Sequence, residues 1–163
     1  MVLSKIVSVL FFLSLVTFLG AQAQPEMTKN AHKEIRKHWE VKDNYLLSVK
    51  KDKHLEVFSV QSGDKKLGWA VLAEVKGRHD YFDVLLIYSG QGILEHTKVL
   101  VYRSSYGTEV TNPRWLRQFY GSSADRELRY KKDIDGLSGA TFSAESLVKM
   151  VNKGNARIVN LIE

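Results

Sequence analysis

A turn rich in small residues lies directly before a helical pattern near the C-terminal end of this 163-residue chain. Residues 135–141 have the sequence DGLSGAT, and we expect a helix from Ser143 onward. Gly136 and Gly139 permit turn conformations and the close approach of a bulky group, and Thr141 supplies a hydroxyl at the end of the turn. The first N–H groups of a helix and the positive end of its dipole stabilise negative charge. The arrangement therefore predicts a site that would stabilise a phosphate ester on Thr141.

The order of residues in this turn resembles the D-x-x-S-G-A-T signature of FMN-binding domains. These domains occur in the covalent-FMN subunits of sodium-translocating NADH:quinone reductase and of Rnf complexes, and in small exported proteins. In that family the last threonine carries FMN through a phosphodiester made by an FAD:protein FMN transferase, so the resemblance implies Thr141 as the covalent acceptor. Relatives often continue T-x-T-S or T-x-S-S, whereas Thr141 is followed here by FSA, so one downstream hydroxyl is missing.

Two upstream segments extend the resemblance, which covers roughly residues 69–151. Residues 102–110, YRSSYGTEV, and residues 114–121, RWLRQFYG, resemble the Y-R-E-x-x-G-x-E-[VI] and W-x-x-Q-F-x-G segments of the small exported members. Ser104 stands where many relatives have glutamate, whereas Glu109 retains the second carboxylate. Three segments in the same order, with a turn before a helix, favour the resemblance over a chance match to one short motif.

The resemblance and the local chemistry together predict roles for the residues of the turn. Thr141 is the expected covalent acceptor, and Asp135 is expected to position the turn or the metal ion of the transferase. Ser143 is expected to cap the helix and to hydrogen-bond the phosphate. The expected cofactor-binding residues are Thr141, Asp135, Ser138, Gly139, Ala140, Ser143, Glu109, Tyr106 and Gly107.

Each segment also has an interpretation that needs no cofactor. The turn can be an ordinary loop in which Ser143 is the N-cap and Glu145 favours the first helical turn. Tyr106, Gly107 and Glu109 can form a strand-end turn with a solvated carboxylate. Aromatic candidates for stacking on a flavin, each of a type that more often packs in a core, are Tyr81, Tyr106 and Trp115.

The first residues of the chain have the features of a secretory signal peptide. Lys5 is followed by an apolar run over residues 6–19 and by the sequence AQA ending at Ala23. We expect cleavage after Ala23, with an uncleaved membrane anchor as the alternative. Residues 1–23 are thus the expected signal peptide and residues 24–163 one domain, exported to the periplasm or the outer face of the cytoplasmic membrane.

Composition excludes several kinds of chemistry. The chain has no cysteine, so disulfides, thiolate catalysis and iron–sulfur ligation are excluded. Its net charge of +6 is spread without a long basic run, which favours a solvated surface over nucleic-acid binding and leaves attraction to anionic lipids or an acidic redox partner open. The histidines lack metal-binding spacings, so no metal site is predicted. Ser146 and Lys149 match S-x-x-K without its companion motifs, and we expect Ser146 to be an ordinary helix residue.

The apolar runs and turns predict an α+β fold, a single domain with a twisted, mostly antiparallel sheet and flanking helices. The resemblance implies that this fold is like that of FMN-binding domains. Short turns between successive strands predict hairpins. Strands are expected over residues 55–60, 67–75, 81–88 and 98–103. Helices are expected over residues 26–39, 113–119 and 143–153, the last ending at Gly154. Trp115, Leu116 and Phe119 are spaced to face a core.

Two functions from different classes follow from these observations. The first is an exported electron carrier with covalent FMN, relaying electrons between a membrane redox system and an extracytoplasmic acceptor. Its expected partners are an FAD:protein FMN transferase and a membrane electron-transfer complex or other redox partner, with no nucleic acid. The alternative is a non-catalytic partner-binding or assembly module of the same fold without covalent flavin. A stand-alone enzyme is less expected, because the chain has no second cofactor motif.

Overall fold

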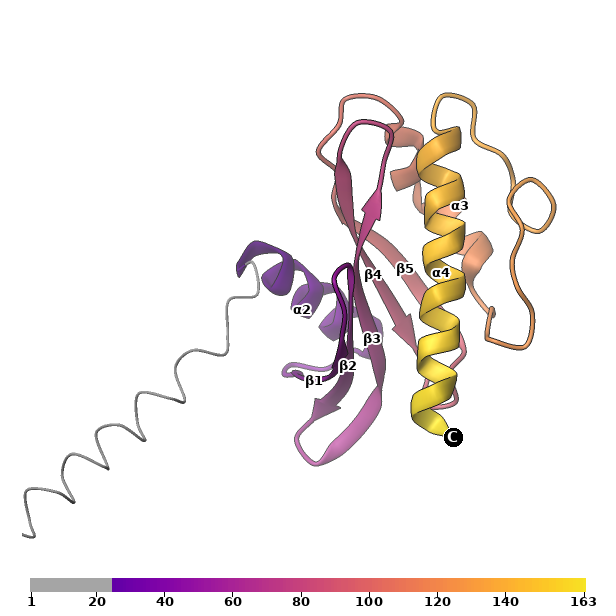
Figure 1. Cartoon of the computed structure of the whole chain (residues 1–163). Coiled ribbons are helices and arrows are strands. Elements are labelled where there is room, and N and C mark those ends of the chain that lie inside the picture. Colours follow the sequence, from indigo (N-terminus) through magenta and orange to yellow (C-terminus); the bar gives the residue numbers. More distant parts are fainter. Residues whose placement is uncertain (1–24) are drawn as a thin grey trace, which may run out of the picture.

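A twisted five-stranded antiparallel sheet forms the centre of the computed structural model, which describes residues 25–163 (Figure 1). The strands, each paired with the next in chain order, are β1 (Tyr45–Lys51), β2 (Leu55–Ser62), β3 (Lys65–Lys76), β4 (Tyr81–Tyr88) and β5 (Leu94–Val101). Short turns join them, which makes neighbours antiparallel. The predicted α+β class and antiparallel sheet are confirmed. The expected signal peptide, residues 1–23, lies outside the described residues.

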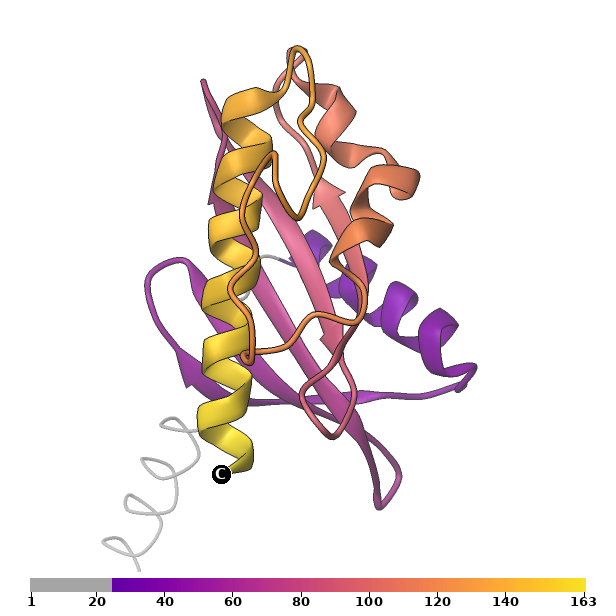
Figure 2. The ribbon, with the colours of Figure 1, turned by 90° about the vertical axis from the view of Figure 1, so that its right-hand side faces the viewer.

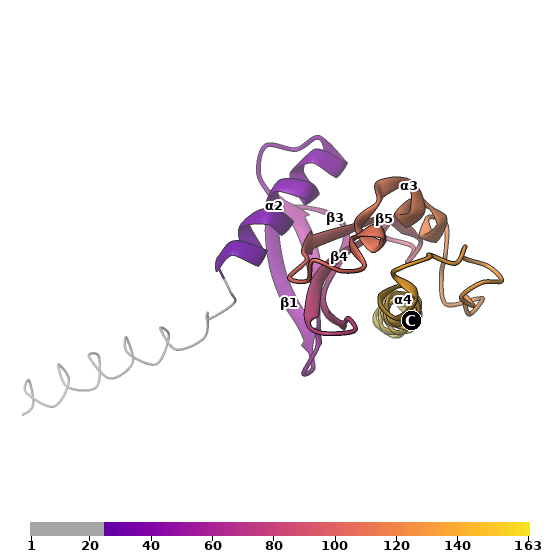
Figure 3. The same cartoon turned by 90° about the horizontal axis from the view of Figure 1, so that it is seen from above.

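Two helices cover opposite faces of the sheet: α2 (Pro25–Trp39) on one and α4 (Thr141–Ile162) on the other (Figure 3). Alternate side chains of a strand point to opposite faces, so β3 and β4 contribute to two apolar cores. The core beneath α4 includes Val71, Ala73, Val84 and Leu86. The core beneath α2 includes Ala70, Leu72, Leu85 and Ile87. Among residues 25–163, none of the helices combines the length and the apolar character that a membrane span requires.

Helix α4 is longer than the sequence predicts at both ends. It begins at Thr141 rather than Ser143 and continues to Ile162, well past Gly154. Gly154 is a buried helical residue, and a Cβ there would lie 2.6 Å from the Tyr88 hydroxyl oxygen. The expectation that Gly154 ends the helix is therefore wrong, because the glycine provides the space in which α4 packs closely on β4.

Apart from β1, the other elements agree with the predictions in kind and differ at their ends. Strand β1 was not predicted, and β5 lies nearer the N-terminus than residues 98–103. After β5 the chain forms a 3-10 turn, η1 (Thr108–Thr111), then the short helix α3 (Pro113–Leu116) and a second 3-10 turn, η2 (Arg117–Phe119). The predicted core-facing residues of this region, Trp115, Leu116 and Phe119, are all buried.

Candidate functional site

Thr141 is the first residue of α4, and its side chain is exposed. Its Oγ1 donates a hydrogen bond to the carbonyl oxygen of Leu137 at 3.1 Å. Ala140 is the N-cap residue and provides no side-chain hydrogen bond to the helix. The first N–H groups of a helix have no acceptor within the helix, so α4 presents unsatisfied donors beside the Thr141 hydroxyl. This is the local arrangement that the turn sequence predicts, with the helix beginning two residues earlier than expected.

The two glycines of the turn are needed for different reasons. Gly139 has φ of +82°, a left-handed conformation that other residues adopt only with strain. A Cβ on Gly139 would also lie 3.3 Å from Oε1 of Glu109, so this carboxylate lies against the turn. Gly136, by contrast, is not left-handed, and a Cβ there would lie 3.2 Å from Cγ of Lys131. The expected conformational role is therefore confirmed for Gly139 and wrong for Gly136, which makes room for a lysine side chain.

Asp135 is held through its backbone by the segment that contains Trp115. The Asp135 N–H donates to Oε1 of Gln118 at 2.9 Å, and Nε1 of Trp115 donates to the Asp135 carbonyl oxygen at 2.9 Å. The side chain of Asp135 is exposed, whereas Trp115 is buried. The fold thus brings together two of the motifs noted in the sequence, and Trp115 holds the turn rather than offering a stacking surface.

Ser143 links the start of α4 to the loop after β5. It is 3% exposed and its Oγ lies 3.3 Å from the hydroxyl oxygen of Tyr102, which itself donates to the Tyr106 carbonyl oxygen at 2.9 Å. A phenol has one proton, so Ser143 is the donor to Tyr102. The expectation that Ser143 is the N-cap is wrong, because the helix has already begun at Thr141 and the serine is buried in its first turn.

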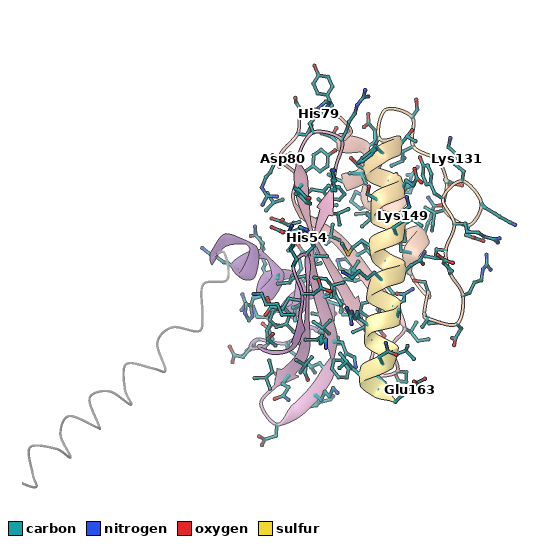
Figure 4. All side chains as sticks on the ribbon, viewed as in Figure 1. His54, His79, Asp80, Lys131, Lys149 and Glu163 are labelled. Carbon is teal, nitrogen blue, oxygen red and sulfur yellow. The ribbon has the colours of Figure 1, made fainter. Side chains whose placement is uncertain are left out.

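A hollow of about 700 Å³ opens beside Thr141, and we name it the Tyr106 hollow. Its walls are the turn between β3 and β4, with Arg78 and His79, the loop with Tyr106 and Gly107, and residues 139–143. Figure 4 shows His79 at the tip of this turn, near the start of α4. Volumes of 300–1,000 Å³ are typical of small-molecule sites, so the hollow has the capacity for an organic cofactor.

A second hollow of about 420 Å³ lies on the other side of Thr141, and we name it the Lys131 hollow. It is formed by residues 127–131 and by α4, and it includes Lys131 and Lys149. Figure 2 shows the long segment before α4 running beside that helix, and Figure 4 places both lysines there. Thr141 and Glu145 line both hollows. Thr141 therefore lies on the ridge that separates them.

Of the three aromatic residues considered for flavin stacking, one lines a hollow beside Thr141. Tyr106 is 75% exposed and lines the Tyr106 hollow. Tyr81 instead stacks on His54, with ring centroids 5.3 Å apart, and Trp115 is buried in the core. Ser138 and Ala140 lie in the turn, as expected, with Ser138 exposed and Ala140 buried.

An ion pair between the buried Asp83 and the partly exposed Arg103, which sequence reasoning missed, anchors the loop after β5. The two terminal guanidinium nitrogens of Arg103 donate to the carboxylate of Asp83, which is 1% exposed. Arg103 also donates to the Tyr81 carbonyl oxygen at 3.0 Å. The hydrogen bond to Asp83 raises the pKa of the Arg103 guanidinium. The only sequence signal was an aspartate within the apolar run of residues 81–88.

Arg78, His79 and Lys131 were also missed, because the fold brings them to Thr141 from separate segments of the chain. Ser146 is a residue of α4, as predicted. Within residues 25–163, no group of three or more histidine and carboxylate side chains is arranged to hold a metal ion. No family model matches this chain, and no curated protein matches its sequence.

Proposed function

We propose that this protein is an exported electron carrier to which FMN is joined by a phosphodiester at Thr141. The observation that carries the proposal is the exposed Thr141 hydroxyl, at the first residue of α4 and between two hollows. The D-x-x-S-G-A-T order of the turn supports FMN as the group attached. The signal-like sequence of residues 1–23 supports export.

The residues around Thr141 fit such a group. The Tyr106 hollow has about 700 Å³ and an exposed aromatic side chain on its wall, which suits a planar ring system. The free N–H groups at the start of α4 suit an anionic phosphate. Gly139 has no side chain to obstruct the turn. When bound, a flavin accepts and releases one or two electrons, and its surroundings set its potential.

Attachment is a substitution at phosphorus in which Thr141 is the nucleophile. Its Oγ1 forms a bond to the FMN phosphorus of FAD, the pyrophosphate P–O bond breaks, AMP leaves and the threonine proton passes to a base. In the free protein that proton is directed to the Leu137 carbonyl oxygen, which is too weak a base to accept it. A separate transferase therefore supplies the base and the metal ion. Covalent attachment keeps the flavin at a high effective concentration at its site, so that it is not lost by dissociation. This suits an exported protein in a compartment that supplies little flavin.

The decisive experiment measures intact mass and visible absorbance after denaturation, for protein co-expressed with an active FAD:protein FMN transferase. We expect a yellow wild-type chain, heavier by one FMN less one water, and a colourless, unmodified Thr141→Ala variant. Thr111→Ala is the matched control, because Thr111 Oγ1 also donates to a carbonyl oxygen, that of Thr108, at 2.7 Å. It should be modified like wild type.

Thr141→Ala should keep a thermal midpoint close to that of wild type, because substitutions of exposed residues usually change stability by less than about 0.5 kcal/mol. Loss of flavin therefore reports the missing hydroxyl rather than unfolding. An unmodified wild-type chain, beside another substrate that the same transferase modifies, would reject the carrier and favour a partner-binding module without covalent flavin.

A further inference from the structure

The loop before the D-x-x-S-G-A-T turn is connected to the Thr141 hydroxyl by two hydrogen bonds in series. The hydroxyl of Tyr130 accepts from the N–H of Leu137 at 2.9 Å, and the carbonyl oxygen of the same Leu137 accepts from Oγ1 of Thr141 at 3.1 Å. The N–H and the carbonyl group of Leu137 belong to the two successive peptide units that flank its Cα. A displacement of Tyr130 would therefore move Leu137, and with it the carbonyl oxygen that accepts the hydrogen bond of Thr141.

Lys131 follows Tyr130 in a conformation that the loop enforces. Its φ is +63°, uncommon for a residue with a side chain. Its N–H donates to the Ile134 carbonyl oxygen at 2.8 Å, and Tyr130 and Ile134 form an isolated β-bridge. The aliphatic part of the Lys131 side chain lies over Gly136. A Cβ added at Gly136 would be 3.2 Å from Cγ and 3.4 Å from Cε of Lys131. Loop and turn therefore hold this side chain within the hollow that Thr141 also lines.

Two other cationic side chains of the Lys131 hollow already form ion pairs with carboxylates. Arg129 Nε lies 3.1 Å from Oδ2 of Asp133, and Lys149 Nζ lies 3.1 Å from Oε1 of Glu145. Glu127 also lines the hollow. Glu145 is one helical turn after Thr141, on the same face of α4. A phosphate on Thr141 therefore has two cations and the carboxylate of Glu127 on the loop side, and the carboxylate of Glu145 close to it on its own helix.

We propose that the Lys131 hollow is the phosphate side of the site, in which Lys131 neutralises the phosphodiester on Thr141 and Glu145 opposes it. The larger Tyr106 hollow then receives the isoalloxazine ring. This inference rests on the proposed function. It identifies Tyr130, through Leu137, as a residue that positions the acceptor hydroxyl.

The test follows the initial rate at which purified transferase and FAD modify the full chain, measured by intact mass. Lys131→Gln should lower the rate by roughly three- to tenfold, as expected for loss of a charge-assisted contact at a partly exposed site, and Lys131→Arg should restore most of it. Lys132→Gln is the matched control, because Lys132 is the adjacent exposed lysine and does not line the hollow. It should react at the wild-type rate.

Glu145→Gln distinguishes electrostatics from damage to the site. It removes the carboxylate and frees Lys149, so it should raise the rate by about two- to threefold, and high salt should reduce both effects. A lower rate in Glu145→Gln, or an unchanged rate in Lys131→Gln, would overturn the inference while leaving the carrier function intact. An unmodified wild-type chain would overturn both.

The ³¹P spectrum of the modified proteins separates phosphate binding from recognition of the transferase. If Lys131 contacts the phosphodiester, its resonance should shift in Lys131→Gln and stay in place in Lys132→Gln. If Lys131 serves only to dock the transferase, the rate falls and the resonance of the product is unchanged, which contradicts the inference. Tyr106→Ala should alter flavin fluorescence and leave the ³¹P resonance unshifted.

Discussion

At the scale of single residues, the two glycines of the turn should respond differently to the same substitution. Gly139→Ala places a side chain at φ of +82°, so we expect a loss of about 1–2 kcal/mol in the free energy of unfolding. Gly136→Ala would place its Cβ 3.2 Å from Cγ of Lys131 and 3.7 Å from the Tyr130 hydroxyl oxygen, and it should cost less than about 0.5 kcal/mol. Urea unfolding midpoints of the two variants measure these losses. Equal losses at Gly139 and Gly136 would contradict the prediction that only Gly139 is required for its backbone conformation.

The ion pair between the buried Asp83 and the partly exposed Arg103 gives a second prediction at this scale. Arg103→Gln leaves the Asp83 carboxylate, 1% exposed, without its cation, so we expect a loss of about 2–4 kcal/mol. This is less than for a fully buried pair because the Arg103 side chain is 33% exposed. Adding Asp83→Asn should recover part of the loss, since the unpaired charge is then gone. Failure of the double variant to recover would show that Arg103 acts mainly by packing.

The residues of the site were predictable where they belong to a sequence motif, as Tyr106 and Gly107 do in the loop after β5 and as the residues of the turn do. Asp135, Gly139 and Thr141 lie within seven consecutive residues, so one motif identifies them. Arg78 and Lys131 line the hollows beside Thr141 because the β3–β4 turn and the loop before α4 fold toward the start of that helix. No local pattern of residue types records that approach, because it depends on how the helix lies on the sheet.

At the scale of elements, Gly154 determines how closely α4 approaches the sheet. Alanine is normally the better helix residue by about 1 kcal/mol, yet Gly154→Ala would put a Cβ 2.6 Å from the Tyr88 hydroxyl oxygen and 3.0 Å from Cδ1 of Leu86. We therefore expect Gly154→Ala to destabilise the protein by about 1–3 kcal/mol. The exposed Ala156, in the same helix, is the control: Ala156→Gly should cost about 1 kcal/mol. A stabilised Gly154→Ala protein would show that α4 can shift without cost.

The ends of elements were the least predictable part of the fold. Ser143 has the residue type of an N-cap and Gly154 that of a C-cap, and the structure uses both for contacts between segments. Strand β1 escaped prediction because it is an edge strand, with Leu47 and Val49 both exposed. The alternation that reveals a half-buried strand is therefore weak there. The central strands were predicted because both of their faces are buried.

At the scale of the whole molecule, the two faces of the sheet differ in what lies at their edges. The α4 face carries the Thr141 site at one end of its helix. The α2 face is closed by a polar cluster at the rim of its core. His38 Nε2 lies 3.0 Å from Oε2 of Glu95, and the rings of His38 and His96 are 5.7 Å apart. This cluster joins α2 to β5, so its ionisation bears on how firmly the N-terminal helix is held.

His96 should make the stability of this face depend on pH. Burial is the main cause that lowers the pKa of His96, and the charges of His38, Lys98 and Lys37 lower it further, against Glu34. The unfolded chain therefore binds the proton more readily, with a pKa of about 6.5. Neutral His96 therefore contributes fully to the stability of the folded protein above about pH 6.5. This contribution is lost as the pH falls below that value, until His96 is protonated in the folded protein as well.

His96→Asn tests this dependence, because asparagine can still bond the Tyr120 hydroxyl that lies 2.9 Å from Nδ1 of His96. The free energy of unfolding of wild type should fall between about pH 7.5 and 5.5, and the fall should be smaller in His96→Asn. His79→Asn, at an exposed position in the turn between β3 and β4, should retain the wild-type dependence. If His96→Asn and wild type lose stability in parallel, other groups of the α2 face carry the effect. A difference between wild type and His96→Asn that is confined to this pH range identifies His96 as the group responsible. Asp133 acts elsewhere, because its pKa is lowered chiefly by its hydrogen bond with Arg129 and its contribution to stability is lost only in more acidic solution.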